Sequence, residues 1–137
     1  MTSLLVPIIS IIFLSFSSIS SAALSSDVVN AMDGVNACQT ITLRQTYEHC
    51  MQDTNGRIRA AIQSKSSQIL SKYPSSKRQK IFDKIESSIE SNKIKCEREQ
   101  PYFGDSPTGQ RRLPYCIYEN MLEILINVER NIKVFLN

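Results

Sequence analysis

The sequence contains no tryptophan, a single histidine and only four glycines. These absences argue against an all-β barrel or sandwich, whose many tight turns need glycine. His49 is the one imidazole, and no G-x-S-x-G, H-E-x-x-H or P-loop motif occurs, so the common catalytic motifs are missing. A chain of 137 residues is also too short for a two-domain enzyme. We therefore expect one small domain that is not an enzyme.

Charge is missing from the first 22 residues, because every Lys, Arg, Asp and Glu lies after them. Leu4 to Phe16 is an apolar run of about 13 residues, shorter than the roughly 20 that a membrane-spanning helix needs. Small residues follow, and Ser20-Ser21-Ala22 fits the pattern of a signal-peptidase site. We predict that residues 1–22 are a signal peptide cleaved near Ala22/Ala23. An uncleaved membrane anchor is the alternative.

The four cysteines are Cys38, Cys50, Cys96 and Cys116. An even number of cysteines in a small exported chain is typical of two disulfides. No C-x-x-C pair occurs, so we expect neither a metal nor a cofactor. The pairing Cys38–Cys50 with Cys96–Cys116 closes the shorter loops and is preferred. Cys50–Cys96 with Cys38–Cys116 remains open, because an antiparallel helical hairpin would also bring Cys50 near Cys96.

Apolar residues recur at steps of three, four and seven over 43–73, 81–96 and 117–136, which is the periodicity of amphipathic helices. Thr42 and Ser76 each begin a capping-box pattern that predicts a helix start. Tyr73-Pro74 predicts the turn between the first two of these helices. Asn55-Gly56 interrupts the first pattern, but its periodicity continues across the glycine, which favours one helix.

These patterns predict an all-α fold, a small bundle of three to four helices with two disulfides. The last helix, 115–136, has an apolar face wide enough to pack between the two hairpin helices or to dimerise. We expect a flexible N-terminal segment at 23–37 and a disulfide-stapled helical domain at 38–137.

The segment 97–115 carries three of the five prolines and two of the four glycines, which is typical of a loop. A Cys96–Cys116 disulfide would tie both of its ends, and a pre-organised loop loses less entropy when it binds a partner. Loops also carry binding residues more often than framework helices do. We predict a binding loop whose candidate contact residues are Gly104, Asp105, Ser106, Thr108, Gly109, Arg111 and Arg112. A plain connector is the alternative.

The net charge of +3 indicates a modest basic surface. The simplest interpretation is that these charges only keep the protein soluble. The sharper one is an envelope-associated structural or binding protein that contacts anionic surface components. Its cations would be Lys77, Arg78, Lys80, Arg111 and Arg112. We do not expect a nucleic-acid partner, because aromatic residues do not alternate with the basic ones and the chain is predicted to be exported.

The spacing Cys38-x11-Cys50, the long helical hairpin and Cys96-x19-Cys116 around Gly104-Asp105-Ser106 resemble the LprI-type family of small exported bacterial proteins. The resemblance covers about 100 residues, from Cys38 to the last helix. It implies an exported helical domain with two disulfides, periplasmic or secreted. It also implies inhibition of lysozyme, which some members carry out. The expected function is therefore that of an exported binding protein whose partner is a lysozyme or another protein.

Overall fold

The computed structural model describes residues 23–104 and 106–137, so the predicted signal peptide, residues 1–22, lies outside the described part. Four α-helices form this part: α1 (Ser26–Gln39), α2 (Arg44–Leu70), α3 (Ser75–Glu99) and α4 (Pro107–Asn131). Two short 3-10 helices, η1 (Gln100–Phe103) and η2 (Ile132–Leu136), follow α3 and α4. The described residues contain no strand. The predicted all-α bundle is confirmed.

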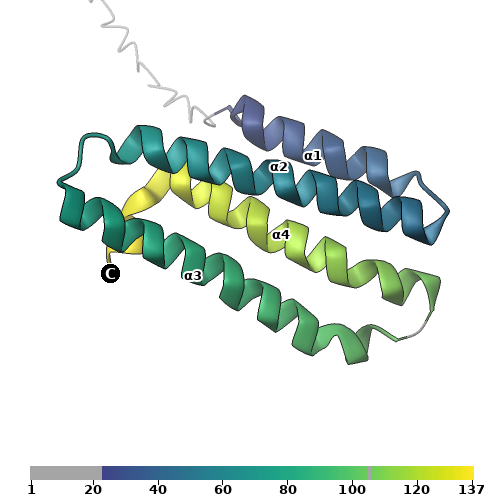
Figure 1. Ribbon diagram of the computed structural model, residues 1–137. Coiled ribbons are helices and arrows are strands. Elements are labelled where there is room, and N and C mark those ends of the chain that lie inside the picture. Colours follow the sequence, from purple (N-terminus) through teal and green to yellow (C-terminus); the bar gives the residue numbers. More distant parts are fainter. Residues whose placement is uncertain (1–22, 105) are drawn as a thin grey trace, which may run out of the picture.

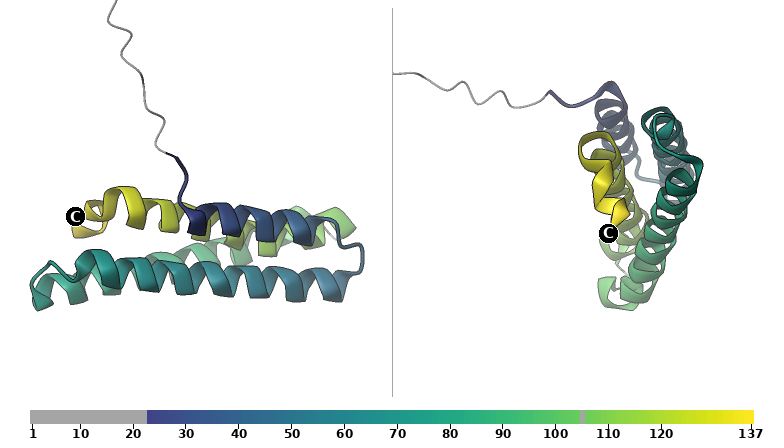
Figure 2. Two further views of the ribbon diagram at one scale, coloured as in Figure 1. Left: turned by 90° about the horizontal axis from the view of Figure 1, so that it is seen from above. Right: turned by 90° about the vertical axis from the view of Figure 1, so that its left-hand side faces the viewer.

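The helices run alternately up and down, and α4 lies between α2 and α3 (Figure 1). α2 and α3 are joined by a short turn and diverge from it, so α4 contacts both while α2 and α3 touch little. α1 is the shortest of the four α-helices and covers only the part of α2 that lies away from this turn. The C-terminal end of the chain returns to the α2–α3 turn, where η2 packs on α3 (Figure 2).

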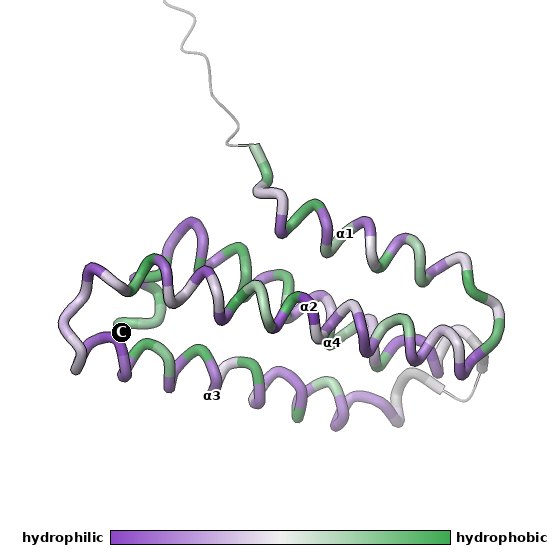
Figure 3. The backbone as a smooth tube through the Cα atoms, turned by 45° about the horizontal axis from the view of Figure 1, so that its top comes forward, coloured by the Kyte–Doolittle hydropathy of each residue, from purple (hydrophilic) through white to green (hydrophobic). Residues whose placement is uncertain are grey.

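The core is mostly aliphatic and continuous along the bundle. Hydrophobic and hydrophilic residues alternate along each helix (Figure 3), and the hydrophobic ones meet inside. Ile62, Leu70, Ile81, Leu125 and Val128 are among the fully buried residues. The wide apolar face predicted for the last helix is what lets α4 pack against α2, α3 and α1 together.

The segment 23–37 was expected to be flexible, and this prediction is wrong. The structure shows α1 there, with Val28, Ala31, Val35 and Cys38 buried against the rest of the bundle. Ser25 caps the helix, because its hydroxyl accepts a hydrogen bond from the backbone N–H of Val28 (3.2 Å). The buried positions are spaced by three, four and three residues, a helical period that small side chains make inconspicuous in the sequence.

The two predicted capping boxes do not act as caps. α2 begins at Arg44 with Leu43 at the N-cap position, and α3 begins at Ser75 with Pro74 there, both without a side-chain cap hydrogen bond. The single helix predicted across Asn55-Gly56 is confirmed, since α2 is continuous from 44 to 70.

The predicted loop at 97–115 is mostly helical, which corrects the expectation drawn from its prolines and glycines. α3 and η1 extend to residue 103, and α4 begins at Pro107, well before the predicted start at Tyr115. Ser106 caps α4 by accepting a hydrogen bond from the N–H of Gly109 (3.0 Å), and proline is favoured in the first turn. Pro114 lies inside α4, where tertiary packing outweighs its poor helix propensity.

None of the helices in the described ranges is both long and apolar enough to cross a membrane.

Candidate functional site

Both disulfides lie toward the end of the bundle that is opposite to the α2–α3 turn. Cys38–Cys50 joins α1 to α2 with a Cα–Cα distance of 5.6 Å, and Cys96–Cys116 joins α3 to α4 with a Cα–Cα distance of 5.8 Å. The preferred pairing is therefore confirmed. Two disulfides are typical of a protein that folds in an oxidising, extracellular environment.

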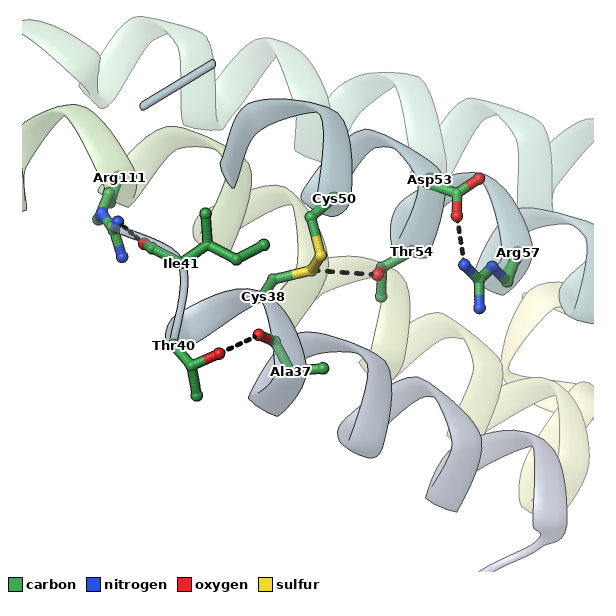
Figure 4. The surroundings of a disulfide bond; sticks show 9 residues. All are labelled: Ala37, Cys38, Thr40, Ile41, Cys50, Asp53, Thr54, Arg57 and Arg111. Carbon is green, nitrogen blue, oxygen red and sulfur yellow. Dashed lines mark hydrogen bonds and ion pairs between the residues drawn. A yellow bond between two sulfur atoms is a disulfide. The ribbon is translucent and has the colours of Figure 1, made fainter. Parts of the chain in front are cut away.

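Around Cys38–Cys50, polar side chains tie α1, α2 and the connection between them together (Figure 4). The Thr54 Oγ1 atom lies 3.5 Å from Cys38 Sγ in the buried interface. Thr40 donates a hydrogen bond from its hydroxyl to the carbonyl of Ala37 (2.8 Å), which closes the end of α1. The connection between the two helices is thus held at a fixed place.

Arg111 joins the first turns of α4 to this connection. Its guanidinium lies 4.3 Å from the centroid of the Tyr47 ring and donates a hydrogen bond to the carbonyl of Ile41. The Tyr47 hydroxyl in turn donates to the carbonyl of Arg111 (3.2 Å). Arg111 is therefore a positioning residue as well as a source of positive charge.

A hollow of about 420 Å³ opens where α1, α2 and α4 meet at this end. We call it the disulfide-end hollow. Its described lining is made of two arginines, two tyrosines, two carboxamides and one threonine: Asn36, Gln39, Tyr47, Thr108, Arg111, Arg112 and Tyr115. The described lining residues include two arginines and no carboxylate.

The two tyrosines of the disulfide-end hollow differ in their surroundings. Tyr47 is 1% exposed, and burial raises its pKa above the ordinary value of 10.0, although the Gln39 hydrogen bond and the Arg111 charge oppose that shift. Tyr115 is only partly buried and lies with its ring centroid 5.5 Å from that of Tyr118. At neutral pH Tyr47 keeps its proton and can donate the hydrogen bond to Arg111.

The predicted binding residues divide into four groups. Thr108, Arg111 and Arg112 line the hollow, as residues of α4 rather than of a loop. Gly104 and Ser106 belong to the connection before α4, where Gly104 has a φ of 76°, while Gly109 is buried. Asp105 lies outside the described residues.

Sequence reasoning missed the other side of the hollow. Asn36 and Gln39 lie in or next to the segment that was expected to be flexible. Tyr47 counted only toward the apolar periodicity of 43–73, and Tyr115 only as the predicted start of the last helix. The helical spacing of Val28, Ala31, Val35 and Cys38 was the one signal that could have placed α1 against α2. No local pattern indicates that α4 would bring Arg111 to Tyr47.

The five cations assigned to an anionic surface do not form one patch. Lys77, Arg78 and Lys80 lie in the first turns of α3, beside the α2–α3 turn. Arg111 and Arg112 lie at the other end, and a helix of the length of α3 spans about 37 Å. An anionic polymer would therefore have to contact both ends of the bundle to reach all five, and the envelope hypothesis stays a prediction.

His49 is exposed on α2. Within residues 23–104 and 106–137, no cluster of three or more His, Cys, Asp and Glu residues is arranged to hold a metal ion.

Comparison with known proteins finds no matching family model, no matching curated protein and no matching solved structure. The resemblance to the LprI-type family therefore stays a prediction.

Proposed function

We propose that this chain is an exported, non-enzymatic binding protein that recognises an acidic group of a protein partner at the disulfide-end hollow. Export is supported by the uncharged first 22 residues together with the two disulfides.

The single observation that carries this proposal is the composition of the disulfide-end hollow. Arg111 and Arg112 contribute two positive charges to a lining whose described residues include no carboxylate. A guanidinium pairs with a carboxylate through two parallel hydrogen bonds, and such charge-assisted bonds are stronger than neutral ones. Tyr47 and Tyr115 add aromatic area with a polar tip, a combination enriched at protein interfaces. The hollow is thus suited to an acidic side chain of a partner.

The disulfides support the proposal because they fix the walls of the hollow before a partner arrives. Cys38–Cys50 holds the end of α1 on α2, and Cys96–Cys116 holds the early part of α4 on α3. A site that is already ordered loses less conformational entropy on binding.

Lysozyme is the first partner to test. The resemblance of the cysteine spacing implies it, and the catalytic cleft of a glycoside hydrolase carries a pair of carboxyl groups. An arginine-bearing surface that reaches such a cleft would block the approach of the cell-wall polymer.

The experiment titrates the mature protein, residues 23–137, into cell-wall lysis assays with several classes of lysozyme. Arg112→Glu should weaken inhibition by roughly ten- to a hundredfold, because it replaces a charge-assisted hydrogen-bond donor by a repelling carboxylate. Lys77→Glu is the matched control, since it makes the same change of charge at the other end of the bundle and should leave inhibition unchanged.

If the protein leaves the rate of lysis unchanged for every lysozyme, the proposal that it inhibits lysozyme is wrong. The envelope hypothesis is tested in parallel on an immobilised anionic polysaccharide. The protein should then be retained on the polysaccharide at low salt and released at high salt, and Lys77→Glu and Arg112→Glu should reduce its retention equally. That result would favour binding through general surface charge and would speak against binding through the hollow.

A further inference from the structure

A second concave surface lies on the opposite side of α4 from the disulfide-end hollow. Two adjoining hollows of about 200 and 190 Å³ share Asn55 and Ile117 in their linings, so they form one groove along α4 between α2 and α3. The groove exists because α2 and α3 diverge and leave this face of α4 open. We call it the amide groove, after its six carboxamide residues: Gln52, Asn55, Asn92, Gln100, Gln110 and Asn120.

Asn55 leaves one hydrogen-bonding atom of this groove unsatisfied. Its Nδ2 donates a long hydrogen bond to the carbonyl of Pro114 (3.4 Å), but its Oδ1 is buried and accepts none. Nearly all buried polar atoms in folded proteins have a partner, so an orphan acceptor requires an explanation. A donor group that enters the groove beside Asn55, with a small rotation of the carboxamide, would provide that partner.

Gly56 is the second observation, and it is independent of Asn55 Oδ1. Glycine is a poor helix former, yet Gly56 lies in the interior of the 27-residue helix α2. Its φ is not in the left-handed region, and a Cβ added to it would meet no atom within 4 Å. By contrast, a Cβ on Gly34 would lie 3.1 Å from the Thr54 side chain, so helix packing explains that glycine. Neither backbone nor packing explains Gly56, which lines the amide groove and keeps it open.

We propose that the amide groove binds an extended peptide segment of a partner protein, with Asn55 as a contact residue and Gly56 as the residue that leaves room for it. A carboxamide carries both a donor and an acceptor and so matches the alternating C=O and N–H groups of a peptide backbone. The floor includes Leu113, Ile117 and Met121, which suit apolar side chains of the peptide. The described lining holds no aromatic ring on which a sugar could stack.

The dimensions set the length of the peptide. From Gln110 to Met121 the helix α4 rises by about 16 Å, which corresponds to about five residues of extended chain. The amide groove and the disulfide-end hollow share no lining residue. The two proposals therefore stand independently.

The test uses the mature protein, residues 23–137, and a panel of fluorescent, end-capped heptapeptides in which apolar and polar residues alternate. Binding is measured by fluorescence anisotropy, and a short N-acetylglucosamine oligomer serves as a competing probe. We expect peptides of the panel to bind and the oligosaccharide not to displace them. Gly56→Trp should weaken binding at least tenfold, because the indole fills the groove. Ser64→Trp, on an exposed part of α2 two turns away, is the matched control and should change nothing.

Gly56→Ala and Asn55→Leu separate a binding role from a structural one. Both should retain or raise the thermal midpoint of unfolding, because alanine favours the helix and leucine removes the orphan acceptor. Asn55→Leu should nevertheless lose peptide binding, and Gly56→Ala should weaken it severalfold, because the added methyl group takes room from the peptide. If Gly56→Trp does not fold, the wild-type protein is titrated with a peptide of the panel and its backbone amide NMR signals are followed. The signals that shift must then be those of residues 55, 56, 92 and 117. No binding by any peptide of the panel, displacement by the oligosaccharide, or shifts elsewhere would each overturn the proposal.

Discussion

The two ends of the bundle are built on different principles. The disulfide end carries two covalent links and the contact between Arg111 and Tyr47. The disulfide-end hollow lies there with its polar lining, and the amide groove extends toward it along α4. At the turn end, Leu70, Ile81 and Phe135 belong to the apolar core, and neither disulfide lies there. The comparison indicates that covalent links allow an end of a small bundle to stay open and polar without losing its order.

The physical reason is the balance between burial and entropy. An apolar core gains stability only from the apolar surface that it shields from water. A disulfide instead stabilises by restricting the unfolded chain, in the chain-entropy view, and does not require that the surface around it be filled. The end with the disulfides can therefore carry binding surfaces.

The largest expected effect comes from removing both links with Ala at Cys38, Cys50, Cys96 and Cys116. Each closes a short loop and is worth about 3 kcal/mol, so the double loss approaches about 6 kcal/mol, comparable with the whole stability of many domains. Urea denaturation measures the loss. Amide hydrogen exchange should accelerate more at the disulfide end than at the turn end. A uniform acceleration would mean that the two ends are not stabilised differently.

The turn end is tested by Ile81→Ala, since Ile81 is 0% exposed in the core. Loss of the buried side chain and the resulting cavity should cost about 3 kcal/mol in the free energy of unfolding. Under conditions where the variant is folded, inhibition of lysozyme through the disulfide-end hollow should remain unchanged in the cell-wall lysis assay. Lys80→Ala, an exposed neighbour, is the control and should stay within about 0.5 kcal/mol of the wild type. Weaker binding by folded Ile81→Ala would show that the ends are coupled.

The smallest expected effect concerns the Tyr47 hydroxyl. Burial raises the pKa of Tyr47 in the folded state above the value of 10.0 that applies in the unfolded state. The protonated Tyr47 hydroxyl therefore contributes its full stabilisation below pH 10.0, and this stabilisation is lost as the pH rises through the folded-state pKa. Tyr47→Phe should cost about 1 kcal/mol at neutral pH, because the hydrogen bond to the Arg111 carbonyl is lost. It should also reduce the fall in stability above pH 10.0. Urea denaturation over an alkaline pH series measures both effects, and an equally steep fall in the variant would contradict them.

The long amphipathic helices could be predicted from the sequence, because residues such as Ile58, Ile62, Ile81, Ile85 and Ile89 repeat at helical spacing and are buried in the structure. α1 could not be predicted with the same ease, since its small side chains give a weak pattern and its stability depends on packing against α2. The start of α4 was also hidden, because prolines and glycines favour a loop locally while the Arg111–Tyr47 contact and the Cys96–Cys116 link favour the helix. Only Ser106-Pro107 signalled a helix start there.

The candidate site was predictable in part. Thr108, Arg111 and Arg112 were among the predicted binding residues, but they were placed in a loop, and the structure shows helix there. Asn36, Gln39 and Tyr47 became part of the site only when three helices met. Such a site is a product of long-range packing, which no local pattern records.

The sequence by itself determined the helical class, the leader without charges and the preference for short disulfide loops, because each follows from local spacing or composition. Tertiary structure decided that α4 lies between α2 and α3, and this placement created both the disulfide-end hollow and the amide groove. The reason is geometric: a wide apolar face on α4 can be buried only by contact with several helices, and the polar edges of those helices then become the walls of the concave surfaces.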